Sequence, residues 1–183
     1  MSEETAKKLF IGICCLTSKR NNPFWEFSLK SRAIPYEEVS WVPPEKYHMS
    51  LAFIGEVDEK QENVLRKNLS KLKAKSFDLS FNGTAFLPHA CLSVIAELSP
   101  RLINLKNAVD SARGNVGELP YHSMFIPHVI LGKIDEIGYN YKKFWEEQKF
   151  KYATHINCIH LYESIKINGQ TEYRILESYL LED

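Results

Sequence analysis

The chain has 183 residues and carries 23 basic and 23 acidic side chains, so its formal net charge is zero. Proteins that hold long nucleic acids by their phosphates usually carry excess positive charge. The neutral balance therefore argues against an extended non-specific nucleic-acid groove, but it is compatible with a small nucleotide or an RNA end. A chain of this length suits one domain with a substantial core.

Cysteine usage and the N-terminal residues bear on where the protein works. Cys14, Cys15, Cys91 and Cys158 lack the paired spacing of structural zinc or redox motifs, so we expect buried thiols. The first residues are polar and acidic, unlike a signal peptide, and no apolar run approaches the ~20 residues that span a bilayer. We therefore expect a soluble cytoplasmic protein without a membrane segment.

Apolar runs and capping signals divide the first half into alternating strands and helices. We expect strands over 9–16 and 39–42, and a helix over Pro23–Ser31 capped by Asn22. A second helix should run from the capping box of Asp58 and Gln61 to about Ala74. Its apolar stripe would consist of Val64, Leu65, Leu69 and Leu72. A histidine-containing strand, residues 47–55, lies between the second strand and the second helix.

The second half repeats this alternation loosely. We expect an antiparallel pair of strands over 77–86 and 91–98, followed by a helix that Ser99 and Pro100 open and Gly114 closes. A polar loop over 115–123 leads to a second histidine-containing strand and a helix over 140–148. The closing strands, over 156–163 and 173–181, would be joined by an Asn168-Gly169 turn. Hairpins mixed with helices in this way indicate an α+β fold with antiparallel sheets.

The two histidine-containing strands are the most informative feature of the sequence. In a strand successive side chains alternate between faces, which groups His48 with Ser50 and Ala52, and His128 with Ile130 and Gly132. Each strand then has an apolar underside for the core and an imidazole on the other face. Two imidazoles that converge on one groove can act as an acid–base pair near neutral pH.

The remaining candidates are weaker. The same alternation places Phe53 on the core face and turns Lys133 away from His128, so we leave both residues out of the site. His89 and His122 are expected at the surface, and His155 and His160 are expected to be structural. A zinc site is not expected, because no His-Glu-x-x-His pattern or close ligand cluster is present.

The segment Trp41-Val-Pro-Pro-Glu-Lys-Tyr-His48-Met-Ser50-Leu-Ala-Phe-Ile-Gly resembles the first signature of the two-histidine phosphoesterases, a His-x-Thr/Ser motif followed by an apolar residue. Lys8-Leu-Phe-Ile-Gly-Ile fits the opening strand of that superfamily, and Tyr162-Glu-Ser with Gly169 and Tyr173 resembles its closing hairpin. The resemblance is greatest to the 2′-5′ RNA ligase / RNA 2′,3′-cyclic phosphodiesterase family. The second signature departs from the pattern, because Ile130 stands where a hydroxyl residue is expected.

The resemblance implies a particular architecture. The expected fold is α+β and bilobed, with a pseudo-twofold axis, antiparallel sheets that line a central groove, and helices packed on the outer faces. Residues 1–183 would form one two-lobed phosphodiesterase-like domain.

The resemblance also implies a chemistry. It predicts an enzyme that hydrolyses 2′,3′-cyclic phosphates at RNA ends or on small nucleotides to 2′-phosphates, without metal or other cofactor, with 2′-5′ ligation as a weaker reverse activity. His48 would be the proton donor, His128 the proton acceptor and Ser50 a phosphate ligand. Ile130 would stand in the same site without a donor. We expect a monomer without an obligate protein partner.

Two alternatives remain open from the sequence. The chain could be a noncatalytic binder of RNA ends or nucleotides, in which Ile130 marks an eroded second motif. It could also be a phosphodiesterase for another cyclic phosphate or for a 2′-5′ oligoadenylate. Retention of both histidines favours catalysis, because a binder needs hydrogen-bond donors but not a matched acid and base.

Overall fold

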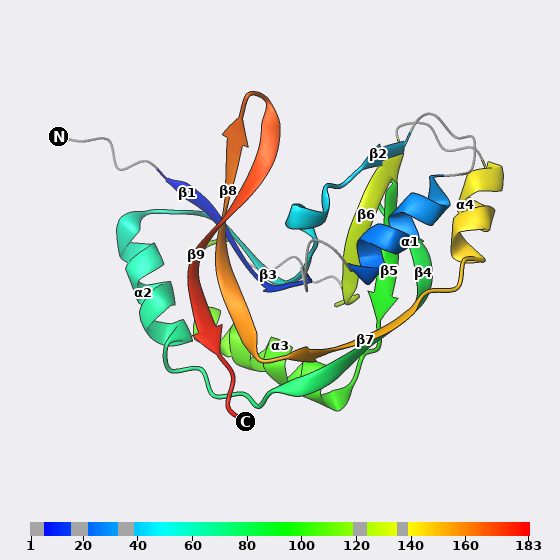
Figure 1. Ribbon diagram of the computed structural model, residues 1–183. Helices are drawn as coiled ribbons and strands as arrows, with labels where there is room; N and C mark the ends of the chain where they lie inside the picture. Colours follow the sequence, from blue (N-terminus) through cyan, green and yellow to red (C-terminus); the bar gives the residue numbers. More distant parts are fainter. Residues whose placement is uncertain (1–5, 16–21, 33–38, 119–123, 135–138) are drawn as a thin grey trace.

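The computed structural model describes residues 6–15, 22–32, 39–118, 124–134 and 139–183, and it shows two antiparallel sheets with helices packed against them (Figure 1). The first sheet has the strand order β3-β1-β8-β9, and the second has the order β2-β6-β5-β4-β7. The fold is α+β, as the sequence predicts.

The described elements have the following bounds. The strands are β1 (Lys7–Cys14), β2 (Val39–Trp41), β3 (His48–Val57), β4 (Phe77–Leu87), β5 (Cys91–Ala96), β6 (His128–Ile134), β7 (Lys151–Ile156), β8 (Cys158–Ile167) and β9 (Gln170–Leu180). The helices are α1 (Pro23–Ser31), α2 (Glu59–Leu69), α3 (Pro100–Arg113) and α4 (Tyr139–Glu146), with a short 3-10 helix η1 (Pro44–Lys46).

The predicted helix starts are confirmed by their side-chain caps. Asn22 accepts hydrogen bonds from the first backbone N–H groups of α1, and Ser99 accepts one from the backbone of α3. Asp58 and Gln61 form the predicted capping box of α2. Gly114 follows α3 with a φ of 55°, a left-handed conformation that glycine adopts without strain.

One predicted helix end and one residue of the predicted apolar stripe are wrong, and one strand is missing from the prediction. Helix α2 ends at Leu69 rather than near Ala74, and Val64, placed on its apolar stripe, is 50% exposed, whereas Leu65 and Leu69 are buried. Strand β7 is a separate edge strand paired with β4, which the sequence reading missed. Its alternate residues are exposed, so its sequence lacks the apolar run that indicates a buried strand.

The chain crosses repeatedly between the two sheets. Strand β1 lies in the first sheet, α1 and β2 belong with the second, and β3 returns to the first. Helices α2 and α3 contact β3 of the first sheet, whereas α1 and α4 contact β6 and β4 of the second. The helices therefore cover one face of each sheet, and we call the opposite face, which carries no helix, the open face. The prediction of one two-lobed domain over residues 1–183 stays a prediction.

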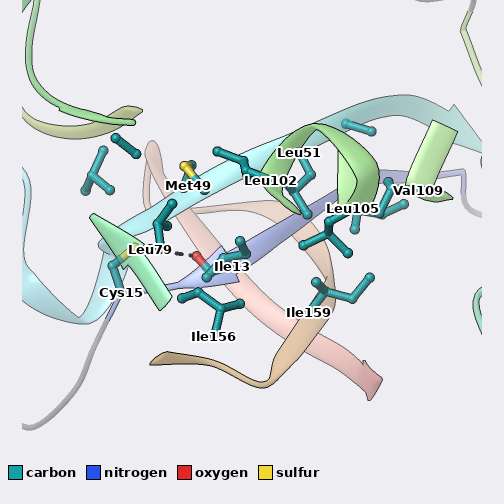
Figure 2. Packing of buried hydrophobic residues seen from close by; sticks show 14 of the residues in the cluster. Ile13, Cys15, Met49, Leu51, Leu79, Leu102, Leu105, Val109, Ile156 and Ile159 are labelled. Atoms are coloured by element: carbon teal, nitrogen blue, oxygen red, sulfur yellow. Dashed lines mark hydrogen bonds between the residues drawn. The ribbon is translucent and has the colours of Figure 1, made fainter. Parts of the chain in front are cut away.

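One part of the core lies between the first sheet and α3. Figure 2 shows Ile13, Met49, Leu51 and Ile159 from three strands of this sheet gathered with apolar side chains of α3. The α3 residues are Leu102, Leu105 and Val109, all at most 1% exposed. This packing buries one side of β1 and β3, so the other side of each strand faces away from this part of the core. Within the described residues no helix is long and apolar enough to cross a membrane.

A buried carboxylate ties the edge of the first sheet to α2. Glu62 is 5% exposed and accepts hydrogen bonds from Lys7 Nζ at 2.8 Å and Arg66 Nη2 at 2.7 Å. Arg66 also donates to Glu177 of β9 at 2.6 Å. Burial would raise the pKa of Glu62, but the hydrogen bonds and charges of Lys7 and Arg66 outweigh it, and the pKa is lowered.

We expect Glu62→Gln to destabilise the fold by about 1.5–3 kcal/mol at pH 7, the usual contribution of a hydrogen bond to a charged group. Because the folded-state pKa is below the unfolded value, this stabilisation is present above the unfolded pKa and is lost as the pH falls through the folded pKa. Urea unfolding at pH 7 should therefore show a gap in unfolding free energy between the wild-type protein and the variant, and this gap should close at about pH 3. Glu56→Gln, at an exposed position of β3, is the control. An equal gap at both pH values would contradict the charge-based account.

Candidate active site

His48 is the first residue of β3, and its ring is held by the backbone. Its Nδ1 lies 2.7 Å from the carbonyl oxygen of Lys46. A carbonyl oxygen only accepts hydrogen bonds, so Nδ1 carries the proton in this contact. Nε2 is then the ring nitrogen that can gain or lose a proton.

His128 is held in the same way on β6. Its Nδ1 lies 2.7 Å from the carbonyl oxygen of Ile126, again two residues earlier in the chain. Pro127 between them favours an extended conformation at Ile126, and its own carbonyl oxygen accepts a hydrogen bond from Ala96 N at 2.9 Å. Nε2 of His128 is therefore also the nitrogen available for proton transfer.

Lys46, whose carbonyl oxygen orients His48, is anchored by the closing hairpin. Lys46 Nζ donates to the Thr171 carbonyl oxygen at 2.9 Å and to the Glu172 carboxylate at 2.7 Å. The carbonyl group that orients His48 thus belongs to a residue held at the start of β9. Sequence reasoning missed this clamp, because its partners are more than a hundred positions apart.

Strand β3 contains an extra residue opposite β1, and this changes which side chains share the face of His48. Gly12 pairs with Ser50 and Ile11 pairs with Ala52, so Leu51 has no partner of its own. Leu51 and Ala52 are both buried. A bulge of this kind shifts the alternation by one residue, and Ala52, expected beside His48, lies on the buried side.

Phe53 consequently lies on the open face, and its predicted place in the core is wrong. Its side chain is 72% exposed. The ring of Phe10 contacts both Phe53 and His48, with centroid distances of 6.3 and 4.9 Å. An exposed aromatic ring so close to the histidine is a surface on which a nucleobase can stack.

Strand β6 repeats the irregularity of β3 at the equivalent position. Ser93 of β5 pairs with Ile130 and Leu92 pairs with Gly132, which leaves Leu131 as the extra residue. From each histidine onward the two strands also show the same order of buried and exposed residues over seven positions. The pairing of β3 with β1 is therefore matched by the pairing of β6 with β5, which is the pseudo-twofold relation predicted from the resemblance.

Lys133 occupies the position equivalent to Phe53, and its predicted orientation away from His128 is wrong. A Cβ on Gly132 would meet Val39 and Trp41 at 3.0 and 3.3 Å, and Trp41 contacts Trp145 of α4. Position 132 thus points to the helix-covered side, and Lys133, which follows it and is exposed, points to the open face with His128.

The two signature positions after the histidines lie where the sequence predicts. Ser50 and Ile130 are each two residues beyond a histidine, before the bulge, and both are partly exposed on the open face. Ser50 Oγ makes no hydrogen bond within the described part of the chain. The first half therefore offers a free hydroxyl beside its histidine, and the second offers an apolar side chain.

Aromatic rings surround His48. Tyr173 meets its ring edge-on at 4.8 Å, and Phe10 and Tyr162 lie at 4.9 and 5.9 Å. Burial lowers the pKa of His48, the hydrogen bond to Lys46 opposes this, and the charge of His128 lowers it further. Strand β3 contacts β6, so the two histidines stand on neighbouring strands of the two sheets.

The other histidines differ in setting. His89 lies in an exposed turn with a φ of 60°, and His155 makes an exposed pair with Asp78 at 2.8 Å. Gly12 of β1 pairs with Ser50 on one side and with His160 on the other. The Nδ1 atom of His160 forms a hydrogen bond with Ser178 Oγ at 2.8 Å, and burial lowers the pKa of this histidine. His122 lies outside the described residues. Among the residues described, no group of three or more His, Cys, Asp or Glu side chains could hold a metal ion.

Comparison with known proteins agrees with this geometry. A family model described as LigT like Phosphoesterase matches residues 30–90, which contain the first signature. The RNA 2′,3′-cyclic phosphodiesterase of Aquifex aeolicus (strain VF5) is 27% identical over 155 residues, which cover 77% of this chain and 81% of that protein.

Solved structures show the same fold. A phosphoesterase crystal structure superposes with a TM-score of 0.80 at 22% identity, over 98% of this chain and 100% of the other. Escherichia coli LigT complexed with 3′-AMP gives a TM-score of 0.77 at 22% identity, with the same coverage. Two equivalent histidine strands, the fold of these structures and a matching first signature make the chain similar to the LigT-like phosphoesterases.

Proposed function

We propose that the protein hydrolyses 2′,3′-cyclic phosphates at RNA ends or on small nucleotides to 2′-phosphates, without a metal ion. The observation that carries this proposal is the equivalent placement of His48 and His128 on β3 and β6. Each uses Nδ1 to bind a carbonyl oxygen two residues earlier and keeps Nε2 for proton transfer. The name of the Aquifex relative supports the choice of substrate.

The proposed reaction needs one acid and one base. A water molecule attacks phosphorus opposite the 3′ oxygen and loses a proton to His128 Nε2. The bond from phosphorus to the 3′ oxygen breaks, and His48 Nε2 gives that oxygen a proton, which leaves a 2′-phosphate and a 3′-hydroxyl. The fixed Nδ1–H of each histidine keeps its ring in the orientation and tautomer that this transfer requires.

Two further side chains on the open faces suit the rest of such a substrate. Ser50 would donate to a non-bridging phosphate oxygen, and Lys133 would attract the phosphate charge from the second half. Phe53 would stack on the base, on the opposite side of the pseudo-twofold axis from Lys133. The site then recognises a phosphate and an aromatic base together, as a nucleotide requires.

The direct test is incubation of the chelator-treated protein with a 2′,3′-cyclic nucleotide, with the product identified by phosphorus NMR. Formation of the 2′-phosphate supports the proposal. A 3′-phosphate product, or binding without turnover, would contradict it and would favour a different cleavage direction or a noncatalytic binder.

His48→Ala and His128→Ala should each lower kcat by about 10²–10⁴-fold, the usual cost of a lost general acid or base. Both variants should fold normally, because the cores of β3 and β6 lie on the other face of each strand. His155→Ala, at an exposed position of β7, is the matched control and should keep full activity. Turnover retained in either site variant would refute the assignment.

The order of the two histidines can be tested through Tyr173. As proton donor in the free enzyme, His48 must be protonated, so activity falls as the pH rises through its lowered pKa. Tyr173→Ser opens the aromatic surroundings and should raise that pKa. The alkaline limb of the kcat/KM profile should then move to higher pH, with the acid limb unchanged. Movement of the acid limb instead would make His48 the base.

Phe53→Ala should raise KM about tenfold for a cyclic nucleotide, as expected for loss of one base–aromatic stack. The same change should leave KM nearly unaltered for a cyclic phosphate without a base. Lys133→Gln should raise KM for both, because it acts on the phosphate, whereas Lys151→Gln on β7 serves as the control. Equal effects of Phe53→Ala on both substrates would remove Phe53 from base recognition.

A further inference from the structure

Ser93 is an unusual residue in the centre of β5. Its side chain is 0% exposed, and its Oγ has no hydrogen-bond partner within the described part of the chain. Buried hydroxyl groups are nearly always paired, because an unpaired one loses its water without gaining another partner. Ser93 carries this cost at a site where alanine would fit, so its hydroxyl calls for an explanation.

The pairing of the strands places Ser93 beside the second signature. Ser93 lies directly opposite Ile130, and its neighbours two positions away, Cys91 and Ile95, lie opposite Lys133 and His128. Directly opposed residues of antiparallel strands share a face, with Cβ atoms about 4.5–5.5 Å apart. Ser93 Oγ therefore belongs to the open face, in the same row as the side chains of His128 and Lys133.

The equivalent pair in the first half has the opposite arrangement. There Ser50 of the signature strand lies opposite Gly12 of β1, and both strand pairs carry a bulge at the next position. Gly12 cannot be replaced by a larger residue, because a Cβ would lie 2.8 Å from the Met49 carbonyl oxygen. Each half thus has one hydroxyl in its cross-strand pair, on the signature strand in the first half and on the neighbouring strand in the second.

We propose that Ser93 supplies to the substrate phosphate the hydroxyl that Ile130 lacks. The inference rests on the proposed phosphodiesterase function and names a further phosphate ligand of that site. Ile130 is partly exposed beside Ser93 on the neighbouring strand, so a change of its rotamer would let an incoming phosphate oxygen reach Oγ. A donor held without a partner in a dry site meets developing negative charge without first giving up another bond.

A purely structural role for Ser93 leads to different expectations. Removal of an unpaired buried hydroxyl relieves its desolvation cost, so Ser93→Ala should raise Tm in either case. Ser93→Ala should lower the activity of the enzyme only if Ser93 binds the substrate phosphate. A variant that is more stable but slower separates the two roles, and it does so without any risk that poor folding explains the loss.

The experiment is a double-mutant cycle of Ser93→Ala and Ile130→Thr, with kcat and KM measured on a 2′,3′-cyclic nucleotide and Tm measured for each variant. Ser93→Ala alone should raise Tm and lower kcat about tenfold or more, the scale of one hydrogen bond to a charged group. Ile130→Thr restores a donor on the signature strand, so Ser93→Ala in that background should change kcat less than about twofold. Affinity for inorganic phosphate should follow the same pattern.

The control is Ser31→Ala, which removes a buried hydroxyl that donates to the Phe27 carbonyl oxygen at 2.9 Å. It should lower Tm and leave kcat unchanged. An unchanged kcat in Ser93→Ala would overturn the assignment of Ser93. So would an equal loss of kcat on Ser93→Ala in the wild-type background and in the Ile130→Thr background. If instead the wild-type protein turns over no cyclic nucleotide, or His48→Ala remains active, the proposed function itself fails.

Discussion

The pairing of each histidine strand with its neighbour, interrupted by an extra residue three positions after the histidine, is the constraint on which the rest of the site depends. Before the bulge, alternation puts a histidine and the signature residue on the open face. The extra residue, Leu51 or Leu131, then keeps two successive positions on the buried side. After it, Phe53 and Lys133 return to the face of the histidines. Without the bulges these two side chains would point into the core.

The apolar residues of the same strands give that arrangement its rigidity. Met49 and Leu51 lie against α3 below the first sheet, and Val129 and Leu131 are fully buried in the second. A one-residue slip of either strand would expose this whole set and bury a histidine. The geometry of the imidazoles is therefore maintained by the hydrophobic core, and the hydrogen bonds from Nδ1 set only the final orientation of each ring.

The sequence allows much of this to be predicted, and the failures at the site have one physical origin. Caps, turns and apolar runs are local, and the helix starts at Asn22, Asp58 and Ser99 follow from them. A bulge is a property of two paired strands, so simple alternation along one strand misplaces Phe53 and Lys133. The aromatic rings around His48 are equally non-local, because Tyr162 and Tyr173 reach it from the closing hairpin.

The departures from symmetry bear on how such a site handles its substrate. Two equivalent halves could bind a phosphate in either of two orientations, but a nucleotide has a base on one side only. Here one half presents Phe53, the free hydroxyl of Ser50 and a histidine enclosed by aromatic rings. The other presents Lys133 and an apolar Ile130 beside a buried serine. These differences make the two orientations unequal in energy, and only with a preferred orientation can one histidine act consistently as the acid and the other as the base.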